Sequence, residues 1–264
     1  MLKLFGIIVV YNKNVNESVA YQSLKAQKSL HLVVCDNSTR DYGNRQIVET
    51  DGYQYADMKG NAGLSRAYNK ALDMIFEHYS DTEGFVMLFD DDTYIPQEYF
   101  VQMKETLRKQ KADIYLPIVK DEIGVLSPSM MKKYYCHRAV GGEVWKIKKN
   151  EICGINSGMA ISMDIFKNYR YNEEIFLDYV DHNFIRDMRK LDKKVEIVET
   201  YLEQSFSSNI FDLQKELARL DIYKKDINVY YKTGIGNRFF FHYSMMRRKM
   251  KLALKYKKIN VLFR

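Results

Sequence analysis

The chain has 264 residues, of which 46% are hydrophobic, so it is long enough to bury a sizeable core without disulfides or a structural metal. Its formal net charge of +7 is concentrated at one end: from Ile227 to Arg264 there are ten Lys or Arg and no Asp or Glu, which leaves 31 basic against 34 acidic residues elsewhere. This distribution excludes a uniformly basic nucleic-acid-binding protein, and we expect no nucleic-acid partner.

The cysteines and the apolar start of the chain indicate a cytosolic body. Cys35, Cys136 and Cys153 are odd in number and contain no C-x-x-C pair, which is evidence for a reducing compartment and against a disulfide framework or a zinc site. The apolar run over 4–10 is short and lacks a cleavage site of small residues, so we expect a core strand rather than a signal peptide. No apolar stretch is long enough to span a bilayer.

Strands and helices are expected to alternate over the first hundred residues. The hydrophobic pattern predicts strands over 4–10, 31–35, 53–56 and 85–89, and helices over 16–28 and 61–76. This alternation predicts an α/β fold with a mostly parallel sheet flanked by helices and joined by right-handed crossovers. In such a sheet the ligand binds just beyond the carboxyl ends of the strands.

The rest of the chain is expected to extend the same sheet and then to leave it. The predicted elements are a helix over 96–109, strands over 113–119, 153–161 and 195–198, a short helix over 163–169 and a helix from Asp181 through Met188. Residues 120–150 read as an irregular excursion or an antiparallel hairpin beside the site, whose loops form ligand pockets. We therefore expect a catalytic domain over 1–210, with a nucleotide half over about 1–95 and an acceptor half over about 96–210, followed by a helical extension over 211–264.

Three consecutive aspartates, Asp90, Asp91 and Asp92, close the apolar run over 85–89. Adjacent carboxylates repel one another, so we expect a cation or a binding role to hold them together. Such oxygen ligands suit Mg²⁺ or Mn²⁺, and an ion of this kind usually also holds a phosphate. Asp90 and Asp92 are the predicted metal ligands, and an acidic, solvated turn is the alternative.

Polar residues follow three further predicted strands, at Tyr11-Asn12, Asp36-Asn37 and Asn61-x-Gly63. For a nucleotide diphosphate, Tyr11 is expected to stack on the base and Asp36 to accept a hydrogen bond from a base N–H. Gly63 permits close backbone approach at a helix start, and Arg66, one turn into that helix, suits a phosphate. Taken singly, Tyr11 reads rather as a packing residue, and Asn61-x-Gly63 as a turn and helix cap. Their recurrence at successive strand ends favours a nucleotide site.

Together, four motifs resemble family 2 inverting glycosyltransferases of the GT-A fold. The motifs are Ile8-Val9-Val10-Tyr11-Asn12, Val34-Cys35-Asp36-Asn37-Ser38, Asn61-x-Gly63-x-x-x-Ala67-x-Asn69 and Phe89-Asp90-Asp91-Asp92. The resemblance covers about 4–205 and is closest to the bacterial rhamnosyl- and galactofuranosyl-transferase-like branch, where a Ser-Gly pair like Ser157-Gly158 recurs. It implies that the strand-end residues, with Asp91, Ser157 and Gly158, bind a UDP- or dTDP-linked sugar, and that Asp90 to Asp92 form a metal-binding D-x-D motif.

The resemblance also implies a catalytic base. Asp181-His182-Asn183-Phe184-Ile185-Arg186 is similar to the acidic motif of the family, in which Asp181 matches the acceptor base and Asn183 replaces a second acid. An attacking hydroxyl must lose its proton, and a positioned carboxylate can take it. Asp178 is the competing base, and helix capping is the alternative role of both aspartates. His182 is expected to be a helix-face residue rather than a ligand.

One departure concerns the metal. Many members carry a metal-binding histidine after the last sheet strand, but residues 201–206 contain none. Either Gln204 or Glu203 replaces it, or the aspartates, the pyrophosphate and water hold the ion alone.

The basic end of the chain suggests where the protein works. Three phenylalanines over 239–241 and a cationic run over 247–251 suit the surface of an anionic membrane. The alternative is a helical appendage that packs on the catalytic domain or on a second copy of the chain, making a homo-oligomer.

We expect a glycosyltransferase that lies peripherally on the inner face of the cell membrane and transfers sugar to a saccharide or lipid-linked acceptor in bacterial surface polysaccharide synthesis. A non-catalytic nucleotide-sugar-binding subunit and a nucleotidyltransferase are the alternatives; the latter would need a glycine-rich basic loop after the first strand, where Val10 to Asn14 has none.

Overall fold

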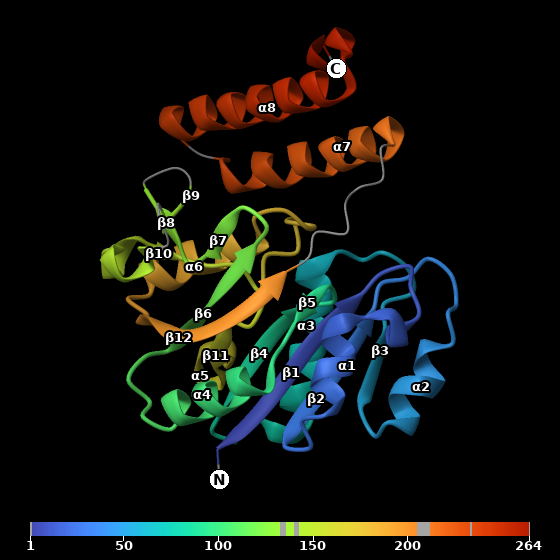
Figure 1. Ribbon diagram of the computed structural model, residues 1–264, viewed down its shortest axis with the longest axis vertical. Helices are drawn as coiled ribbons and strands as arrows, with labels where there is room; N and C mark the ends of the chain where they lie inside the picture. Colours follow the sequence, from blue (N-terminus) through green and yellow to red (C-terminus); the bar gives the residue numbers. More distant parts are fainter. Residues whose placement is uncertain (1, 133–135, 140–142, 205–211, 233, 264) are drawn as a thin grey trace.

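The computed structural model describes residues 2–132, 136–139, 143–204, 212–232 and 234–263. Its main sheet has the strand order β3-β2-β1-β4-β11-β6-β12-β5, and β7 pairs with β6 at the side (Figure 1). The predicted α/β class with a mostly parallel sheet is confirmed.

The first four strands form the nucleotide half of the sheet. They are β1 (Lys3–Val10), β2 (Leu30–Asp36), β3 (Gln54–Asp57) and β4 (Gly84–Asp90), and all four are parallel. The helices between them are α1 (Val19–Lys25), α2 (Asn44–Thr50) and α3 (Leu64–Tyr79). Because the strand order reverses at β1, the carboxyl ends of β1 and β4 form the switch point at which such sheets bind ligands.

Two predictions for this half need correction. The helix expected over 16–28 is a 3-10 turn (Val15–Glu17) followed by α1, because Ser18 separates them. Its backbone N–H closes the turn on Val15, and its Oγ accepts a hydrogen bond from the Tyr21 N–H at 3.1 Å, which caps α1. Helix α2 was not predicted at all; its seven residues are too few for a clear helical period.

The second half completes the sheet with mixed pairing. Its elements are β5 (Thr93–Tyr94), α4 (Gln97–Leu107), β6 (Ile114–Asp121), β7 (Gly124–Ser127), β11 (Ala160–Ser162), α5 (Met163–Phe166), α6 (Val180–Lys190) and β12 (Val195–Gln204). Strand β11 runs antiparallel between β4 and β6, and β12 runs parallel to β6. The single strand expected over 153–161 is wrong, since the chain turns between β10 (Ile152–Cys153) and β11. At this turn Gly158 has φ +75°, and a Cβ there would lie 2.4 Å from Leu202.

A small three-stranded sheet, in the order β10-β8-β9, fills the segment that was expected to be irregular or a hairpin. Strands β8 (Ser129–Met131) and β9 (Cys136–Arg138) are antiparallel, as is β10 to β8. Short 3-10 turns at Val144–Lys146 and Lys149–Glu151 return the chain to β10. The antiparallel alternative is therefore the correct one.

Two apolar cores cover the two faces of the main sheet. On β1, Phe5 and Ile7 face the core that includes α3, α5 and α6, whereas Ile8 and Val10 face the core that includes α1, α2 and α4. Burial on both faces explains why the central strands are continuous apolar runs.

The C-terminal extension is an antiparallel helix pair, α7 (Leu213–Tyr230) and α8 (Ile235–Tyr256), followed by a 3-10 turn (Ile259–Phe263), at the top of Figure 1. The pair has its own apolar core, which Tyr179 of the catalytic part joins. The domain boundary expected between 210 and 211 lies outside the described residues. Among the described helices, none is long and apolar enough to cross a membrane.

Candidate active site

The carboxyl ends of β4 and β12 bring two aspartates and a glutamine together. The Nε2 atom of Gln204 donates to Asp92 at 3.2 Å and lies 3.4 Å from a carboxylate oxygen of Asp90. Gln204 reaches this position because β12 pairs with β5 and sets Gln204 opposite Thr93. The hydroxyl of Ser157 donates to the same oxygen of Asp90.

The local electrostatics disfavour the ionised forms of Asp90 and Asp92 when no cation is bound. Burial raises the pKa of Asp90 to about 7; the charges of Asp92 and Asp181 add to the effect, and the hydrogen bond from Ser157 opposes it. Burial, followed by the charge of Asp91, also raises the pKa of Asp92. The protein alone thus compensates these negative charges poorly, which favours a bound cation.

The residues at this point fit a divalent metal. Asp90 and Asp92 offer carboxylate oxygens, and the Oε1 atom of Gln204 is buried without a hydrogen-bond partner among the described residues. Such oxygen donors are the ligands that Mg²⁺ and Mn²⁺ prefer. Of the two proposed substitutes for the family histidine, Gln204 lies here and Glu203 is exposed.

Asp91 faces away from its two neighbours. Its carboxylate pairs with the Lys13 ammonium at 2.7 Å, and its backbone carbonyl accepts a hydrogen bond from the Ser18 hydroxyl at 2.7 Å. The structure thus separates Asp91 from the pair formed by Asp90 and Asp92.

At the end of β2, Asp36 is buried and held on three sides. It accepts hydrogen bonds from the Ser38 N–H at 2.9 Å, the Asn44 amide at 2.8 Å and the Tyr55 hydroxyl at 3.1 Å. A carboxylate has about four acceptor positions, so one remains for a ligand.

At the end of β1, Tyr11 and Asn12 have different surroundings. The Tyr11 side chain is 46% exposed, so its ring is accessible. Asn12 adopts φ +51°, and its Oδ1 atom accepts from the Thr39 N–H at 2.9 Å while its own N–H donates to the Ser38 hydroxyl at 2.9 Å. Asn12 therefore braces the loop after β2 against the end of β1.

The structure shows a close approach at Gly63, and it involves Phe176. The φ of Gly63 is +89°, and a Cβ there would lie 2.6 Å from the Phe176 ring. Asn61 supports the turn by accepting from the Gly63 N–H at 3.3 Å. Arg66 lies on the surface, 3.4 Å from Glu173.

Two other buried acceptors lie in the quoted motifs but were not predicted as site residues. The Oδ1 atoms of Asn37 and Asn156 have no hydrogen-bond partner among the described residues. Asn37 follows Asp36, with its amide nitrogen donating to the Gly63 carbonyl at 3.2 Å, and Asn156 precedes Ser157. Since buried polar atoms are normally paired, both indicate donors supplied by a ligand or by water.

The two candidate bases differ in their partners. Asp178 forms a two-pronged ion pair with Arg219 of α7, and Arg248 of α8 lies 3.7 Å away. Asp181, in the first turn of α6, accepts a hydrogen bond from the His182 N–H at 2.7 Å, and no ion pair to it forms among the described residues. Burial is the largest cause of its raised pKa.

A tyrosine that was not predicted belongs to the same site. The Tyr68 hydroxyl is buried without a hydrogen-bond partner in the described structure. Burial, with the charges of Asp90 and Asp181, raises the pKa of Tyr68 well above its usual value. Tyr68 thus stays protonated as a hydrogen-bond donor within electrostatic reach of Asp90 and Asp181. Its place inside the Asn61-to-Asn69 motif was the only available signal.

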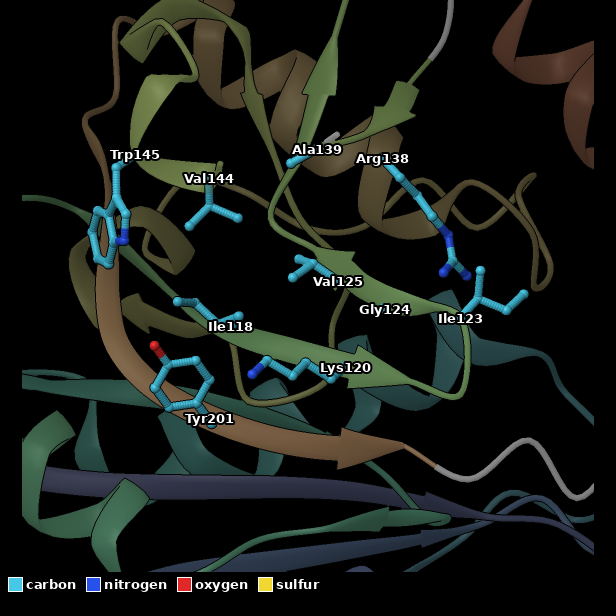
Figure 2. Close-up of a pocket in the computed structure, with 10 residues that line it drawn as sticks. All are labelled: Ile118, Lys120, Ile123, Gly124, Val125, Arg138, Ala139, Val144, Trp145 and Tyr201. Carbon is cyan, nitrogen blue, oxygen red and sulfur yellow. The ribbon is translucent and has the colours of Figure 1, made fainter. Parts of the chain in front are cut away.

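A pocket of about 480 Å³ lies against β6, β7 and β12 (Figure 2). It is lined by Lys120 of β6, Tyr201 of β12, and Arg138 and Trp145 from the segment expected to form such pockets. The Lys120 ammonium lies 4.4 Å from the centre of the Tyr201 ring. Since Lys120 pairs with Glu203 and side chains alternate along a strand, the pocket lies on the face of β12 that carries Tyr201 and Glu203, opposite to Gln204.

Two of the three cysteines, which form no C-x-x-C pair in the sequence, meet a histidine in the fold. Donor atoms of Cys136, Cys153 and His182 all lie within 4.8 Å of one another. They come from β9, β10 and α6, so their spacing in the sequence could not reveal them.

Known structures share this fold. The crystal structure of S. aureus TarS 1–349 is 19% identical, with a TM-score of 0.54 over 86% of this chain and 66% of that one. Its complex with UDP-GlcNAc is 18% identical, with a TM-score of 0.53 over 99% of this chain and 73% of that one. A longer TarS structure is 19% identical, with a TM-score of 0.55 over 89% of this chain and 45% of that one. The chain thus spans less than two thirds of two of these proteins, and no curated protein matches it.

The sequence itself decides the family. The family model described as glycosyl transferase family 2 matches residues 7–176, which is more than half of the chain. The protein therefore belongs to glycosyl transferase family 2.

Proposed function

We propose that the protein is a metal-dependent, inverting glycosyltransferase that takes its sugar from a nucleotide diphosphate, UDP or dTDP. The observation that carries this proposal is the position of Asp181, a half-buried carboxylate within electrostatic reach of Asp90 and without an ion-pair partner in the described structure. A carboxylate held in this way is suited to accept a proton.

In the proposed reaction, the Asp181 carboxylate takes the proton of the acceptor hydroxyl, whose oxygen then attacks the anomeric carbon from the face opposite the nucleotide. The bond from that carbon to the diphosphate oxygen breaks in the same step, so the anomeric configuration inverts. Mg²⁺ or Mn²⁺ on Asp90, Asp92 and Gln204 would neutralise the departing diphosphate. Ser157 holds Asp90 in place through its hydrogen bond.

We assign the donor nucleotide to the ends of β1 and β2. The accessible Tyr11 ring offers a stacking face, and Asp36 and Asn37 retain acceptor capacity for a base or ribose. The similar fold of TarS with UDP-GlcNAc supports a nucleotide-sugar donor. Membership of the rhamnosyl- and galactofuranosyl-transferase-like branch, and a role in surface polysaccharide synthesis, stay predictions.

We assign the acceptor to the pocket of Figure 2. The exposed rings of Trp145 and Tyr201 offer apolar faces for a sugar, and Lys120 supplies positive charge beside Arg138, which is ion-paired with Asp121. An acceptor with a saccharide part and a phosphate group, such as a lipid-linked saccharide, matches both features.

We further propose that α8 rests on an anionic membrane surface, where such an acceptor would be found. Six apolar residues follow one another at helical spacing along α8 and are 44% to 93% exposed: Ile235, Phe239, Tyr243, Met246, Met250 and Leu254. We call these six the α8 stripe. Exposed Arg247 and Lys251 flank it, which matches an anionic lipid surface better than a neutral partner.

The function is tested by measuring release of the nucleotide diphosphate from the sugar donor. The full chain is incubated with a panel of UDP- and dTDP-sugars, with Mn²⁺ or with chelator, and free nucleotide diphosphate is measured. We expect metal-dependent release from at least one donor, and its loss in Asp181→Asn. Metal-dependent binding of a nucleotide-sugar without any release or transfer would favour the non-catalytic subunit instead.

A further inference from the structure

Two thiols and an imidazole converge beside α6, outside the aspartate cluster. Cys136 lies on β9, Cys153 on β10 and His182 in the first turn of α6. One donor atom from each lies within 4.8 Å of the other two. We propose that Cys136, Cys153 and His182 form a zinc site that fastens the small sheet to α6.

The geometry is close to that of a bound ion. Zinc binds sulfur at about 2.3 Å and imidazole nitrogen at about 2.0–2.1 Å in a tetrahedron. Donor atoms at most 4.8 Å apart need to move inward by only about 0.5 Å each to reach those bond lengths. Side-chain rotation provides this movement, and the fourth position is open to water.

The strand pairing argues against a disulfide between the two cysteines. Cys153 pairs with Ser129 and Cys136 with Met131, so they lie on the two strands that flank β8. Two strand spacings are about 10 Å in a flat sheet, whereas a disulfide needs Cα atoms within about 7 Å. The thiols nevertheless point to one place, which is the arrangement that a metal ion requires.

The surroundings suit a structural ion. Cys153 is fully buried, whereas Cys136 and His182 are half-buried, which leaves an entry path. The Arg189 guanidinium already donates to the Ile152 carbonyl at 2.7 Å, so α6 and β10 are held in register without the metal. The strands of the small sheet have only three, three and two residues, so a metal link would add stability that their packing cannot supply.

The site would also influence the reaction centre through its position. His182 follows Asp181 directly and donates its backbone N–H to the Asp181 carboxylate. An ion on the His182 ring would fix the first turn of α6, and with it the direction of Asp181. The zinc assignment does not depend on the proposed transfer reaction, because its test is metal binding.

The test uses the full chain, stripped with chelator and titrated with Zn²⁺ in excess Mg²⁺, which occupies oxygen-ligand sites. We expect about one tightly held zinc per chain by elemental analysis, and thiolate-to-metal charge-transfer absorption when Co²⁺ replaces it. Cys153→Ser and His182→Gln should each weaken zinc binding at least tenfold.

Matched controls separate this site from incidental binding. Cys35→Ser, which removes the third cysteine, and His78→Gln, an exposed histidine, should keep the zinc. The proposal would be overturned by any of three results. Cys153→Ser could still bind zinc, the unchanged chain could bind no zinc while all its thiols are reduced, or non-reducing mass spectrometry could show a Cys136–Cys153 disulfide. Because the Co²⁺ spectrum is recorded on the unchanged protein, a misfolded variant does not decide the outcome.

Discussion

Gln204 is the residue through which the proposed metal site of this chain differs from the pattern expected for many family members. Its amide nitrogen contacts Asp90 and Asp92, and its buried oxygen has no partner in the described structure. An amide can contribute an oxygen ligand but is a weaker donor than imidazole for transition metals, so the site favours hard ions such as Mg²⁺ and Mn²⁺.

Removing a metal ligand should abolish both transfer and metal-dependent binding. We predict that Asp90→Ala and Asp92→Ala each lower Mn²⁺-dependent nucleotide affinity at least about tenfold, because the diphosphate loses its counter-charge. Calorimetry with UDP or dTDP and Mn²⁺ measures this. Asp41→Ala, at an exposed aspartate, is the control, and unchanged affinity in both site variants would refute the metal assignment.

Metal binding should depend on pH around neutrality. Because the Asp90 pKa is raised to about 7 in the metal-free protein, the ion must displace a proton below that pH. We predict that Mn²⁺ affinity rises about tenfold per pH unit up to about 7 and then levels off. The stability of the metal-free protein has the opposite pH dependence. Its free energy of unfolding falls as the pH rises from about 4 to 7, because the folded state holds the Asp90 proton more tightly than the unfolded state does. Calorimetry and thermal melts from pH 5 to 8 would measure both trends.

Substitutions of the two candidate bases should have different effects on turnover and stability. We predict that Asp181→Asn leaves nucleotide-sugar binding nearly intact and lowers turnover by about a hundredfold or more, the usual contribution of a positioned base. Asp178→Asn should mainly destabilise the fold, by about 1–2 kcal/mol after allowance for solvent screening, because Arg219 and Arg248 lose their partner. An inactive Asp178 variant beside an active Asp181 variant would reverse the assignment.

The sequence identified most single residues of the site but not their contacts. Asp90, Asp92, Gln204 and Ser157 do lie together, since residues after parallel strands share one edge of the sheet. The contact of Gly63 with Phe176 and the cysteine cluster could not be predicted, because both bring together residues at least 17 positions apart in the sequence.

At the scale of elements, α8 combines two different faces. Phe241, Met245 and Leu252 face the core shared with α7, while the α8 stripe faces outward. The inner face thus packs as the packing alternative expected, whereas membrane binding by the α8 stripe stays a prediction. The composition alone could not separate the faces without the helix bounds and its partner.

Membrane binding should depend on the stripe and on its basic flanks. We predict that Phe239→Ser with Leu254→Ser reduces sedimentation with anionic vesicles severalfold without lowering the melting temperature, since both side chains are exposed. Arg247→Glu with Lys251→Glu should do the same at low salt, as each surface cation contributes about 1 kcal/mol.

The control for this experiment is Leu191→Ser, an exposed leucine outside the tail. A second copy of the chain would be shown to cover α8 if the full chain did not bind anionic vesicles and instead formed dimers that depend on the α8 stripe. The membrane proposal would then be abandoned.

At the scale of the whole molecule, a buried aspartate joins the C-terminal helices to the catalytic part. Asp226 of α7 is fully buried and accepts backbone hydrogen bonds from Phe176, Leu177 and Asp178 at 2.7, 2.8 and 2.7 Å. These residues lie just before the helix that carries Asp181. The extension is thus a support for the site rather than a separable tail, which sequence patterns could not indicate.

Loosening this connection should affect stability and turnover together. We predict that Asp226→Asn lowers the unfolding free energy by about 2–4 kcal/mol, because an amide nitrogen replaces an acceptor oxygen facing N–H donors. Turnover should fall more than nucleotide affinity, which depends on the distant ends of β1 and β2. Asp221→Asn on the exposed side of α7 is the control. A stable and fully active Asp226 variant would contradict the supporting role.

The central claim is catalysis of sugar transfer at the site formed by Asp90, Asp92, Gln204 and Asp181. The most direct measurement is nucleotide diphosphate release from a panel of UDP- and dTDP-sugars by the full chain, with Mn²⁺, with chelator, and in Asp181→Asn. We predict release from at least one donor that chelator stops and that falls about a hundredfold or more in the variant. Release that is insensitive to both chelator and Asp181→Asn would contradict the claim.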